Sequence, residues 1–189
     1  MAKPSRHRGV IETGRRVFLR RPRRGDAIEY VTLRQCSARF LRRWEPLPSK
    51  GKTAAAAFAE WLESRAGSRH EKLLICRASD GAILGAINFN EIVRGPAQCA
   101  FLGYWIGAPH ARQGYMTEAL RLALRHGFGA LGLHRVEANI MPVNRASIAL
   151  VRRAGFRREG YSPRYLKIAG RWEDHERWAL VAGGRRSRR

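Results

Sequence analysis

The chain has 189 residues, 44% of them hydrophobic, which is enough for one domain with one sizeable core. The 37 Lys and Arg residues outnumber the 15 Asp and Glu residues, and this net charge of +22 favours RNA, ribosomes, acidic proteins or cofactor phosphates over cationic partners. No apolar run approaches the ~20 residues that span a bilayer, and the basic N-terminus lacks the apolar block of a secretory signal, so we expect no membrane partner.

Cysteine and histidine spacing argues against two further classes of protein. Cys36, Cys76 and Cys99 are odd in number and far apart, unlike a disulfide framework or a metal knuckle. The six histidines show no metal-ligand spacing either. We therefore expect reduced thiols, no bound metal and a cytoplasmic location.

The two ends of the chain differ in composition from the middle. Residues 1–16 are polar, basic and aperiodic, and predict a flexible basic arm. Residues 183–189 predict a similar flexible basic tail. Residues 17–182 show neither a repeat nor a long linker, so they predict a single domain.

The first elements of this domain are a short strand and two helices. The strand covers Val17 to Leu19. Asp26, with Glu29 three residues later, has the pattern of a capping box and predicts a helix that carries Ile28 on its apolar side. The alanine-rich stretch from Thr53 to Ser64 predicts the second helix.

The middle of the chain predicts three antiparallel strands. Lys72 to Ala78 forms the first, and the tight-turn pair Asp80-Gly81 leads into the second, Ile83 to Ile92. Ala97 to Ile106 forms the third. A helix with a core face follows, because apolar residues recur at helical spacing in Met116, Leu120, Ala123, Leu124, Phe128 and Leu131.

The last third alternates between strand and helix. Arg135 to Ile140 predicts a strand, and Asn144 to Ala154 a helix that Gly155 ends. Arg157 to Lys167 and Trp172 to Val181 predict the last two strands, around a turn at Gly170. The order predicts a mixed α/β domain of the α+β type, with a largely antiparallel sheet, and not a doubly wound one.

A glycine-bearing loop before the third helix is the most informative segment. Arg112, Gln113 and Gly114 precede a helix that begins near Met116 or Thr117. Backbone N–H groups in such a loop, with the positive end of the helix, suit a phosphate or pyrophosphate. The alternative is an ordinary strand-to-helix connection with a surface arginine.

A second polar segment opens the fourth helix. Pro142 cannot continue a strand ladder, Asn144 is a favourable N-cap residue, and Ser147 follows one turn later. The two polar side chains therefore point to the same place. In the alternative interpretation Asn144 only caps its helix and Ser147 is an ordinary surface residue.

Together these segments resemble the GCN5-related N-acetyltransferase (GNAT) superfamily, and within it the Rim-type ribosomal-protein alanine N-acetyltransferases. The matching blocks are Cys99–Gly107, Gln113–Leu120, His134–Val136, Ala138–Asn139, Met141–Pro142, Asn144, Gly155–Phe156, Glu159–Tyr161, Tyr165–Leu166, Gly170, Trp172 and Asp174–His175. The resemblance implies the GNAT fold, a central, mostly antiparallel sheet that splays at an acetyl-CoA cleft and is flanked by about four helices.

The resemblance also implies a set of acetyl-CoA contacts. Backbone groups of one strand would pair with the pantetheine arm, a loop would wrap the pyrophosphate, and two side chains of the following helix would reach the pantetheine and the phosphates. In chain order these residues are Tyr104, Trp105 and Ile106 for the strand, Arg112, Gln113, Gly114, Tyr115, Met116 and Thr117 for the loop, and Asn144 and Arg153 for the helix. Ser147 would lie near the sulfur and donate to the leaving thiolate.

Three carboxylates are candidates for the general base. The position of a glutamate that serves in related ribosomal acetyltransferases falls on Leu166, which has no basic group. Glu91, Glu137 and Asp174 are the carboxylates in suitable segments, and we choose Glu91 as the candidate catalytic base. The alternative is that Glu91 is a solvated strand-end residue.

The resemblance implies transfer of an acetyl group to the N-terminal Ala or Ser of a ribosomal protein within a ternary complex. A small-molecule amine, such as an antibiotic or a polyamine, is an alternative acceptor. A ribosome- or RNA-binding assembly factor with secondary or lost activity is another alternative, since Ala111 and Met116 depart from the family pattern. Arg152-Arg153 and Arg157-Arg158 would then form an RNA face, or only a solvated one.

Overall fold

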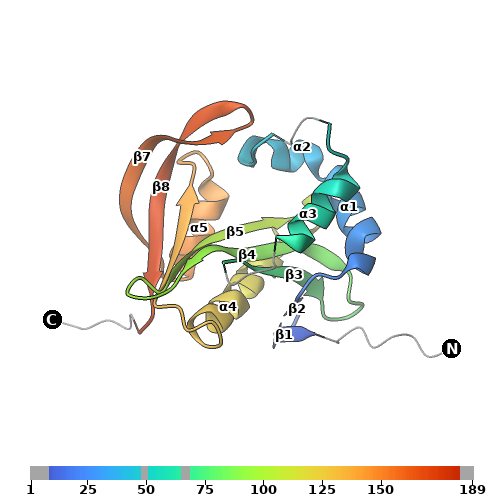
Figure 1. Ribbon diagram of the computed structural model, residues 1–189, viewed down its shortest axis with the longest axis horizontal. Helices are drawn as coiled ribbons and strands as arrows, with labels where there is room; N and C mark the ends of the chain where they lie inside the picture. Colours follow the sequence, from blue (N-terminus) through green and yellow to red (C-terminus); the bar gives the residue numbers. More distant parts are fainter. Residues whose placement is uncertain (1–8, 48–50, 65–68, 184–189) are drawn as a thin grey trace.

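The computed structural model describes residues 9–47, 51–64 and 69–183 (Figure 1). Its strands are β1 (Val10–Thr13), β2 (Val17–Arg20), β3 (Glu71–Arg77), β4 (Ile83–Val93), β5 (Cys99–Ile106), β6 (Arg135–Ile140), β7 (Arg157–Ile168) and β8 (Arg171–Val181). Its α-helices are α1 (Ala27–Cys36), α2 (Ala38–Leu41), α3 (Ala54–Glu63), α4 (Tyr115–Phe128) and α5 (Arg145–Arg153), and its short 3₁₀ turns are η1 (Arg24–Asp26), η2 (Arg42–Trp44) and η3 (Ala108–His110).

The eight strands form one sheet in the order β1-β2-β3-β4-β5-β6-β8-β7. Every neighbouring pair is antiparallel except β5 and β6, which run parallel. The expected mixed α/β fold with a mostly antiparallel sheet is therefore confirmed. In the described part of the chain, five α-helices replace the four expected, because a break at Ser37 divides the first into α1 and α2.

Helices cover both faces of the sheet. On one face α4 and α5 build the larger core, in which Leu120 of α4 and Val151 of α5 are fully buried against strand residues such as Ile87 and Val136. On the other face α1 and α3 cover a smaller core around Phe18 and Leu74, with Tyr30, Leu33, Trp61 and Trp105 packed against it. β3 and the first half of β4 are therefore buried on both faces, which explains their nearly continuous apolar sequence, whereas buried and partly exposed residues alternate along β6.

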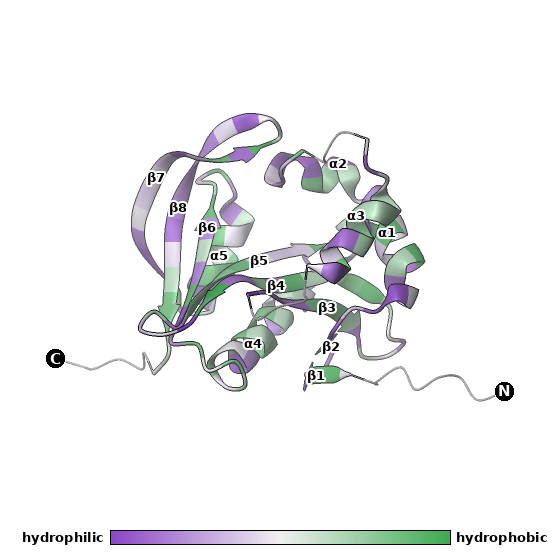
Figure 2. Ribbon diagram, viewed as in Figure 1, coloured by the Kyte–Doolittle hydropathy of each residue, from purple (hydrophilic) through white to green (hydrophobic). Residues whose placement is uncertain are grey.

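The hydrophobic colouring separates the centre of the sheet from its edge. Figure 2 shows β3 and β4 largely hydrophobic and β7 largely hydrophilic. Most of β7 is exposed, since it is the edge strand of a long hairpin with β8. Figure 1 shows that this hairpin extends toward α2.

The expected boundary of the N-terminal arm is wrong. Val10–Thr13 forms β1, which pairs with β2, and Ile11 packs against the larger core. The apolar pair Val10-Ile11 was the sequence signal for this strand, because two adjacent apolar side chains can cover the two faces of a sheet edge. Residues 1–8 of the expected arm and 184–189 of the expected tail lie outside the described residues.

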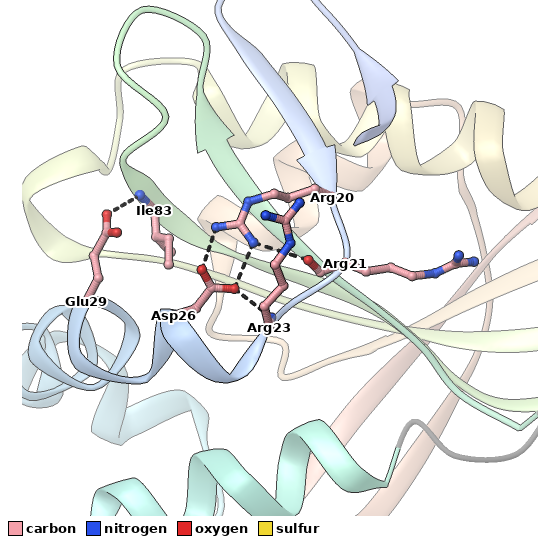
Figure 3. A network of polar contacts seen from close by, with 6 residues as sticks. All are labelled: Arg20, Arg21, Arg23, Asp26, Glu29 and Ile83. Carbon is pink, nitrogen blue, oxygen red and sulfur yellow. Dashed lines mark hydrogen bonds and ion pairs between the residues drawn. The ribbon is translucent and has the colours of Figure 1, made fainter. Parts of the chain in front are cut away.

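The expected capping box does not form (Figure 3). Asp26 instead accepts two hydrogen bonds of 2.7 Å from the buried guanidinium of Arg20. Glu29 accepts a 2.6 Å hydrogen bond from the backbone N–H of Ile83, which ties α1 to β4. The capping residues therefore bond to Arg20 and to the distant Ile83 instead of to each other's backbone, and Ile28 is 84% exposed instead of core-facing.

Candidate functional site

The parallel strands β5 and β6 separate after a short paired stretch. Their register covers only Cys99 to Phe101 on β5 and Arg135 to Glu137 on β6. Beyond Phe101, β5 continues to Ile106 bonded to β4 alone among the described strands. The splay expected of the sheet is therefore present, and the edge of β5 near Tyr104 has backbone groups available to a ligand.

Two hydroxyl groups meet beside this splay. The phenol oxygen of Tyr104 on β5 lies 2.5 Å from Oγ of Ser147 on α5, and either group can be the donor. Burial raises the pKa of Tyr104 to about 12, although the hydrogen bond to Ser147 acts in the opposite direction. The phenol therefore stays protonated at neutral pH and remains a hydrogen-bond donor. The sequence assigned only the backbone of Tyr104 to the site and missed this hydroxyl.

Asn144 shapes the start of α5. Its Oδ1 accepts a 3.2 Å hydrogen bond from the backbone N–H of Ser147, so Asn144 is the N-cap residue of the helix. This cap holds Ser147 in the first turn, directly opposite Tyr104. A capping asparagine still has its amide nitrogen, so the structural role leaves room for a ligand contact.

The loop before α4 has the backbone conformation of an anion site. Arg112 and Gly114 both adopt positive φ angles, +61° and +82°. Gln113 is held by a 2.8 Å hydrogen bond from its side-chain amide to the carbonyl of Pro109. The first N–H groups of the 14-residue helix α4, at Tyr115 to Thr117, have no partner within the helix and carry its positive dipole end.

Arg16 is a residue of this loop that sequence reasoning missed. It lies 102 positions before Glu118, but its backbone N–H donates to that carboxylate at 2.9 Å. Its guanidinium donates to the carbonyl of Gln113 at 2.9 Å and lies 4.4 Å from the ring centroid of Tyr115. A second cation therefore stands beside the loop that carries Arg112. Only the folded sheet brings the β1–β2 turn to this helix end.

The opposite face of β5 carries an aromatic cluster. The rings of Trp105 and Tyr30 meet edge to face, with their centroids 5.3 Å apart. The guanidinium of Arg34 lies 4.8 Å from the Trp105 ring centroid. Arg34 also holds both carboxylate oxygens of Glu45, at 2.6 and 2.7 Å. Trp105 and Tyr104 therefore face opposite sides of the splay, Trp105 toward α1 and Tyr104 toward α5.

The β7–β8 hairpin closes back onto this second side. The backbone N–H of Ala169, at the hairpin turn, donates to the carbonyl of Glu45 at 2.9 Å. The segment after η2 and the hairpin turn therefore meet above the face that carries Trp105.

The structure does not bring Glu91 to this site. Glu91 lies in the irregular end of β4, where its carboxylate pairs with Arg69. Ile87 is the register partner of Tyr104, so Glu91 lies four residues, or about 13 Å of extended strand, farther along. Sequence reasoning could not see this, because it places a residue on a strand without fixing which neighbour lies opposite.

The other two candidate carboxylates, Glu137 and Asp174, also bind other residues. Glu137 pairs with Arg135 at 2.7 Å, at the closed end of the splay. Asp174 accepts a 2.5 Å hydrogen bond from the phenol of Tyr161 and a 2.7 Å one from the backbone of Arg164. Neither carboxylate is free to face the open end of the splay.

Arg153 ends α5 on the outer surface. Together with Ala149 and Arg152 it lines an open hollow of about 350 Å³. Among the residues that the structure describes, no group of three or more His, Cys, Asp or Glu side chains is placed to hold a metal ion. No described helix has the length and apolar character needed to cross a membrane.

Comparison with known proteins identifies the family. Residues 16–157 match the acetyltransferase (GNAT) domain. The chain is 42% identical to YjcK of Bacillus subtilis (strain 168), named as an N-acetyltransferase, over 57% of this chain and 59% of that protein. It is 34% identical to the [ribosomal protein uS5]-alanine N-acetyltransferase of Escherichia coli (strain K12), over 75% of each chain.

A solved structure agrees with this assignment. Mycobacterium smegmatis RimJ, in complex with CoA-disulfide, superposes with a TM-score of 0.80 and 31% identity, over 88% of this chain and 82% of RimJ. The likeness therefore extends from the sequence to the fold, and the resemblance to the Rim-type enzymes is confirmed. The chain belongs to the GNAT family of acetyltransferases.

Proposed function

We propose that this protein transfers the acetyl group of acetyl-CoA to the N-terminal amine of a ribosomal protein that begins with Ala or Ser. The observation that carries the proposal is the Tyr104–Ser147 pair at the free edge of β5, beside a helix start suited to phosphates. The choice of acceptor is supported by the relative that acts on ribosomal protein uS5.

The residues around the splay suit a CoA thioester. The free backbone edge at Tyr104, Trp105 and Ile106 would pair with the amides of the pantetheine arm. The N–H groups of the Gly114–Thr117 segment, with Arg16 and Arg112 beside them, would hold the pyrophosphate. The amide of Asn144 would contact the pantetheine, and Arg153 would reach the outer phosphates.

The chemistry needs a polarised carbonyl and a stabilised leaving group. A backbone N–H on the edge of β5 would face the oxygen on which negative charge develops. A thiol has a reference pKa of ~8.5, well below that of the Tyr104 phenol, so the phenol and Ser147 would stabilise the thiolate by hydrogen bonds without giving up a proton completely. Placing amine and thioester together would supply much of the rate.

Transfer would be direct, within a ternary complex. Cys99 is the cysteine nearest in sequence to the site segments, and it lies at the first residue of β5, seven positions before Ile106. Cys76 is buried within the other core, where burial raises the pKa of its thiol to about 12. Neither thiol suits an acetyl-cysteine intermediate. We also propose that the reaction takes place in the cytoplasm.

A ribosomal acceptor would agree with the charge of the surface. Arg152, Arg153 and Arg157 are exposed near the junction of α5 and β7, whereas Arg158 pairs with Glu176 at 3.3 Å. We propose that this junction adds salt-sensitive contacts to RNA when the acceptor is part of a ribosome. This contact is tested by ribosome co-sedimentation of the wild type and of Arg157→Gln at several salt concentrations.

The acceptor is tested by intact-mass spectrometry. Purified protein and acetyl-CoA are incubated with unacetylated ribosomes and, separately, with free ribosomal proteins, with Ser147→Ala as the matched control. An acetyl-sized mass gain on the N-terminal residue of one protein, strongly reduced in the control, is the expected result. No gain with intact CoA binding would indicate a small-molecule amine as acceptor, and no gain without CoA binding would indicate the assembly-factor alternative.

A further inference from the structure

The side of the sheet that faces α1 carries a buried histidine, His175, which has no part in the acetyl transfer as described above. Ala138 of β6 and Trp178 of β8 are register partners, and both are buried in the core under α4 and α5. Their neighbours Asn139 and Arg177 therefore face the opposite side. His175, two residues before Arg177, shares that side and is only 3% exposed.

The register places His175 level with the open end of the splay. Phe101 on β5 pairs with Glu137 on β6, so three residues farther Tyr104 is level with Ile140. Ile140 in turn pairs with Glu176 on β8. His175 is thus level with Trp105, two strand spacings or about 10 Å away before the splay widens the gap.

The hydrogen bond of the imidazole determines which nitrogen carries a lone pair. Nδ1 lies 3.0 Å from the backbone carbonyl oxygen of Glu173, which can only accept a hydrogen bond. Nδ1 of the neutral ring must therefore hold the proton, and Nε2 is left unprotonated. The ring of Tyr165 lies against the imidazole, with centroids 5.8 Å apart, and limits its rotation.

Few charged groups near His175 could serve as the base in its place. On its own strand Glu173 and Arg177 share its side of the sheet, and Ser162 is its register partner on β7. Asp174 is adjacent in sequence but faces the opposite side, toward Tyr161. The carboxylate of Glu173 lies nearer the hairpin turn. Glu137 of β6 also faces this side, two residues from Asn139, but its carboxylate pairs with Arg135 at 2.7 Å, and the same guanidinium pairs with Glu159 of β7. Glu173 is therefore the alternative base that the test removes.

We propose that His175 is the base that deprotonates the acceptor amine. This inference rests on the proposed acetyl transfer to an amine. Nε2 would take one proton from the ammonium group, directly or through one water, and later release it to solvent. The neutral nitrogen then forms the N–C bond while the C–S bond breaks, and the sulfur leaves as a thiolate that Tyr104 and Ser147 hydrogen-bond. The nitrogen loses one more proton as the amide forms, and Nε2, having released the first proton to solvent, takes this second one and passes it to solvent in turn. Amine and thiolate therefore have their partners on opposite sides of the splay.

The test compares His175→Asn with Glu173→Gln and the wild type. Asparagine retains a donor for the carbonyl of Glu173 and lacks Nε2, whereas Glu173→Gln removes the competing carboxylate and keeps that carbonyl. The acceptor is the free ribosomal protein mixture, product is quantified by intact mass from pH 6 to 10, and CoA affinity is measured by calorimetry.

We expect His175→Asn to slow transfer about 10²–10⁴-fold at pH 7. The deficit should shrink above pH 8, where an α-amino group with a pKa of ~7.7–8.0 is already neutral. CoA affinity should be unchanged, and Glu173→Gln should keep the wild-type pH profile. A His175→Asn profile equal to the wild type, or the same loss in Glu173→Gln alone, would overturn the assignment.

Two further results distinguish a wrong acceptor from a wrong base. A wild-type protein that binds CoA and acetylates none of the ribosomal proteins would refute the proposed acceptor and the role of His175 with it. If His175→Asn does not fold, nuclear magnetic resonance titration of His175 in the wild type replaces it. The imidazole should titrate at the pH of the acidic limb of kcat/KM, and a mismatch would refute the role.

Discussion

Gly114 offers the sharpest test of the anion site at the start of α4. Its φ of +82° lies in the left-handed region, where an L side chain costs about 1–2 kcal/mol. A Cβ at this position would lie 3.6 Å from Nη1 of Arg16, an ordinary contact. Gly114→Ala therefore measures backbone strain alone, and Gly114→Asp adds one negative charge at the same place.

The repulsion between an aspartate at position 114 and the pyrophosphate can be estimated from Coulomb's law for an assumed separation. A carboxylate at ~6 Å from a doubly charged pyrophosphate experiences repulsion of about 1.4 kcal/mol in water and about 5.5 kcal/mol at an effective dielectric constant of 20. The carboxylate would also draw Arg16 away from the ligand. Since 1.4 kcal/mol corresponds to tenfold in affinity, Gly114→Asp should bind CoA at least about tenfold more weakly than Gly114→Ala.

Isothermal titration calorimetry with CoA measures all three proteins. It is best done at low ionic strength, where charge effects are least screened. Thermal unfolding of each variant shows whether it has folded. If two folded variants bind CoA within twofold of each other, the pyrophosphate does not lie at this loop, and the placement of the anion site is wrong.

Three further predictions concern catalysis and stability. Tyr104→Phe removes a hydrogen bond of ~1.5–3 kcal/mol to the developing thiolate, so kcat should fall about 10- to 150-fold with little change in the KM for acetyl-CoA in steady-state assays. Leu120→Ala empties a fully buried position in α4 and should lower the free energy of unfolding in urea by about 2–5 kcal/mol. Burial alone would raise the pKa of Glu71, but Arg21 and His126 outweigh it and lower that pKa. Its carboxylate therefore stabilises the fold above the unfolded pKa of ~4.3, and this contribution is lost as the pH falls through the folded pKa. The stability difference between wild type and Glu71→Gln should shrink as urea titrations move from pH 6 toward pH 3.

Each of these has its own control. Ser147→Ala should resemble Tyr104→Phe, and if kcat is unchanged in both, the hydroxyl pair does not act on the leaving group. Ile28→Ala alters an apolar residue that is 84% exposed and should change stability by at most about 0.5 kcal/mol. A Glu71→Gln deficit that stays constant across the titration would contradict the lowered pKa.

Several parts of the fold and the site could be predicted from the sequence. Apolar spacing of 3.6 residues predicted α4, and alternation between turn signals predicted most of the strands, because local patterning reflects which face is buried. The segment with Gly114 predicted a loop before a helix, and Asn144 predicted a cap, since both depend on short-range geometry. The ordered blocks that resemble GNAT enzymes predicted the family, and the domain match confirmed it.

Contacts between distant segments could not be predicted in this way. The sequence contains Arg16, Tyr104 and Ser147, but nothing local indicates that Arg16 lies beside the α4 loop or that the two hydroxyls meet. It also suggested Glu91 as the base, since a carboxylate at a strand end looks equally suitable before the register is known. The pairing of β4 with β5 places Glu91 four residues beyond the register partner of Tyr104, where its carboxylate pairs with Arg69.

The sequence by itself therefore determined the kind of chemistry, because loop conformation, caps and apolar periodicity depend on residues a few positions apart. The tertiary structure decided which side chains share the site. Strand register moves a residue about 3.3 Å for each position and alternates its face, so a group such as His175 acquires its place only when β8 pairs with β6.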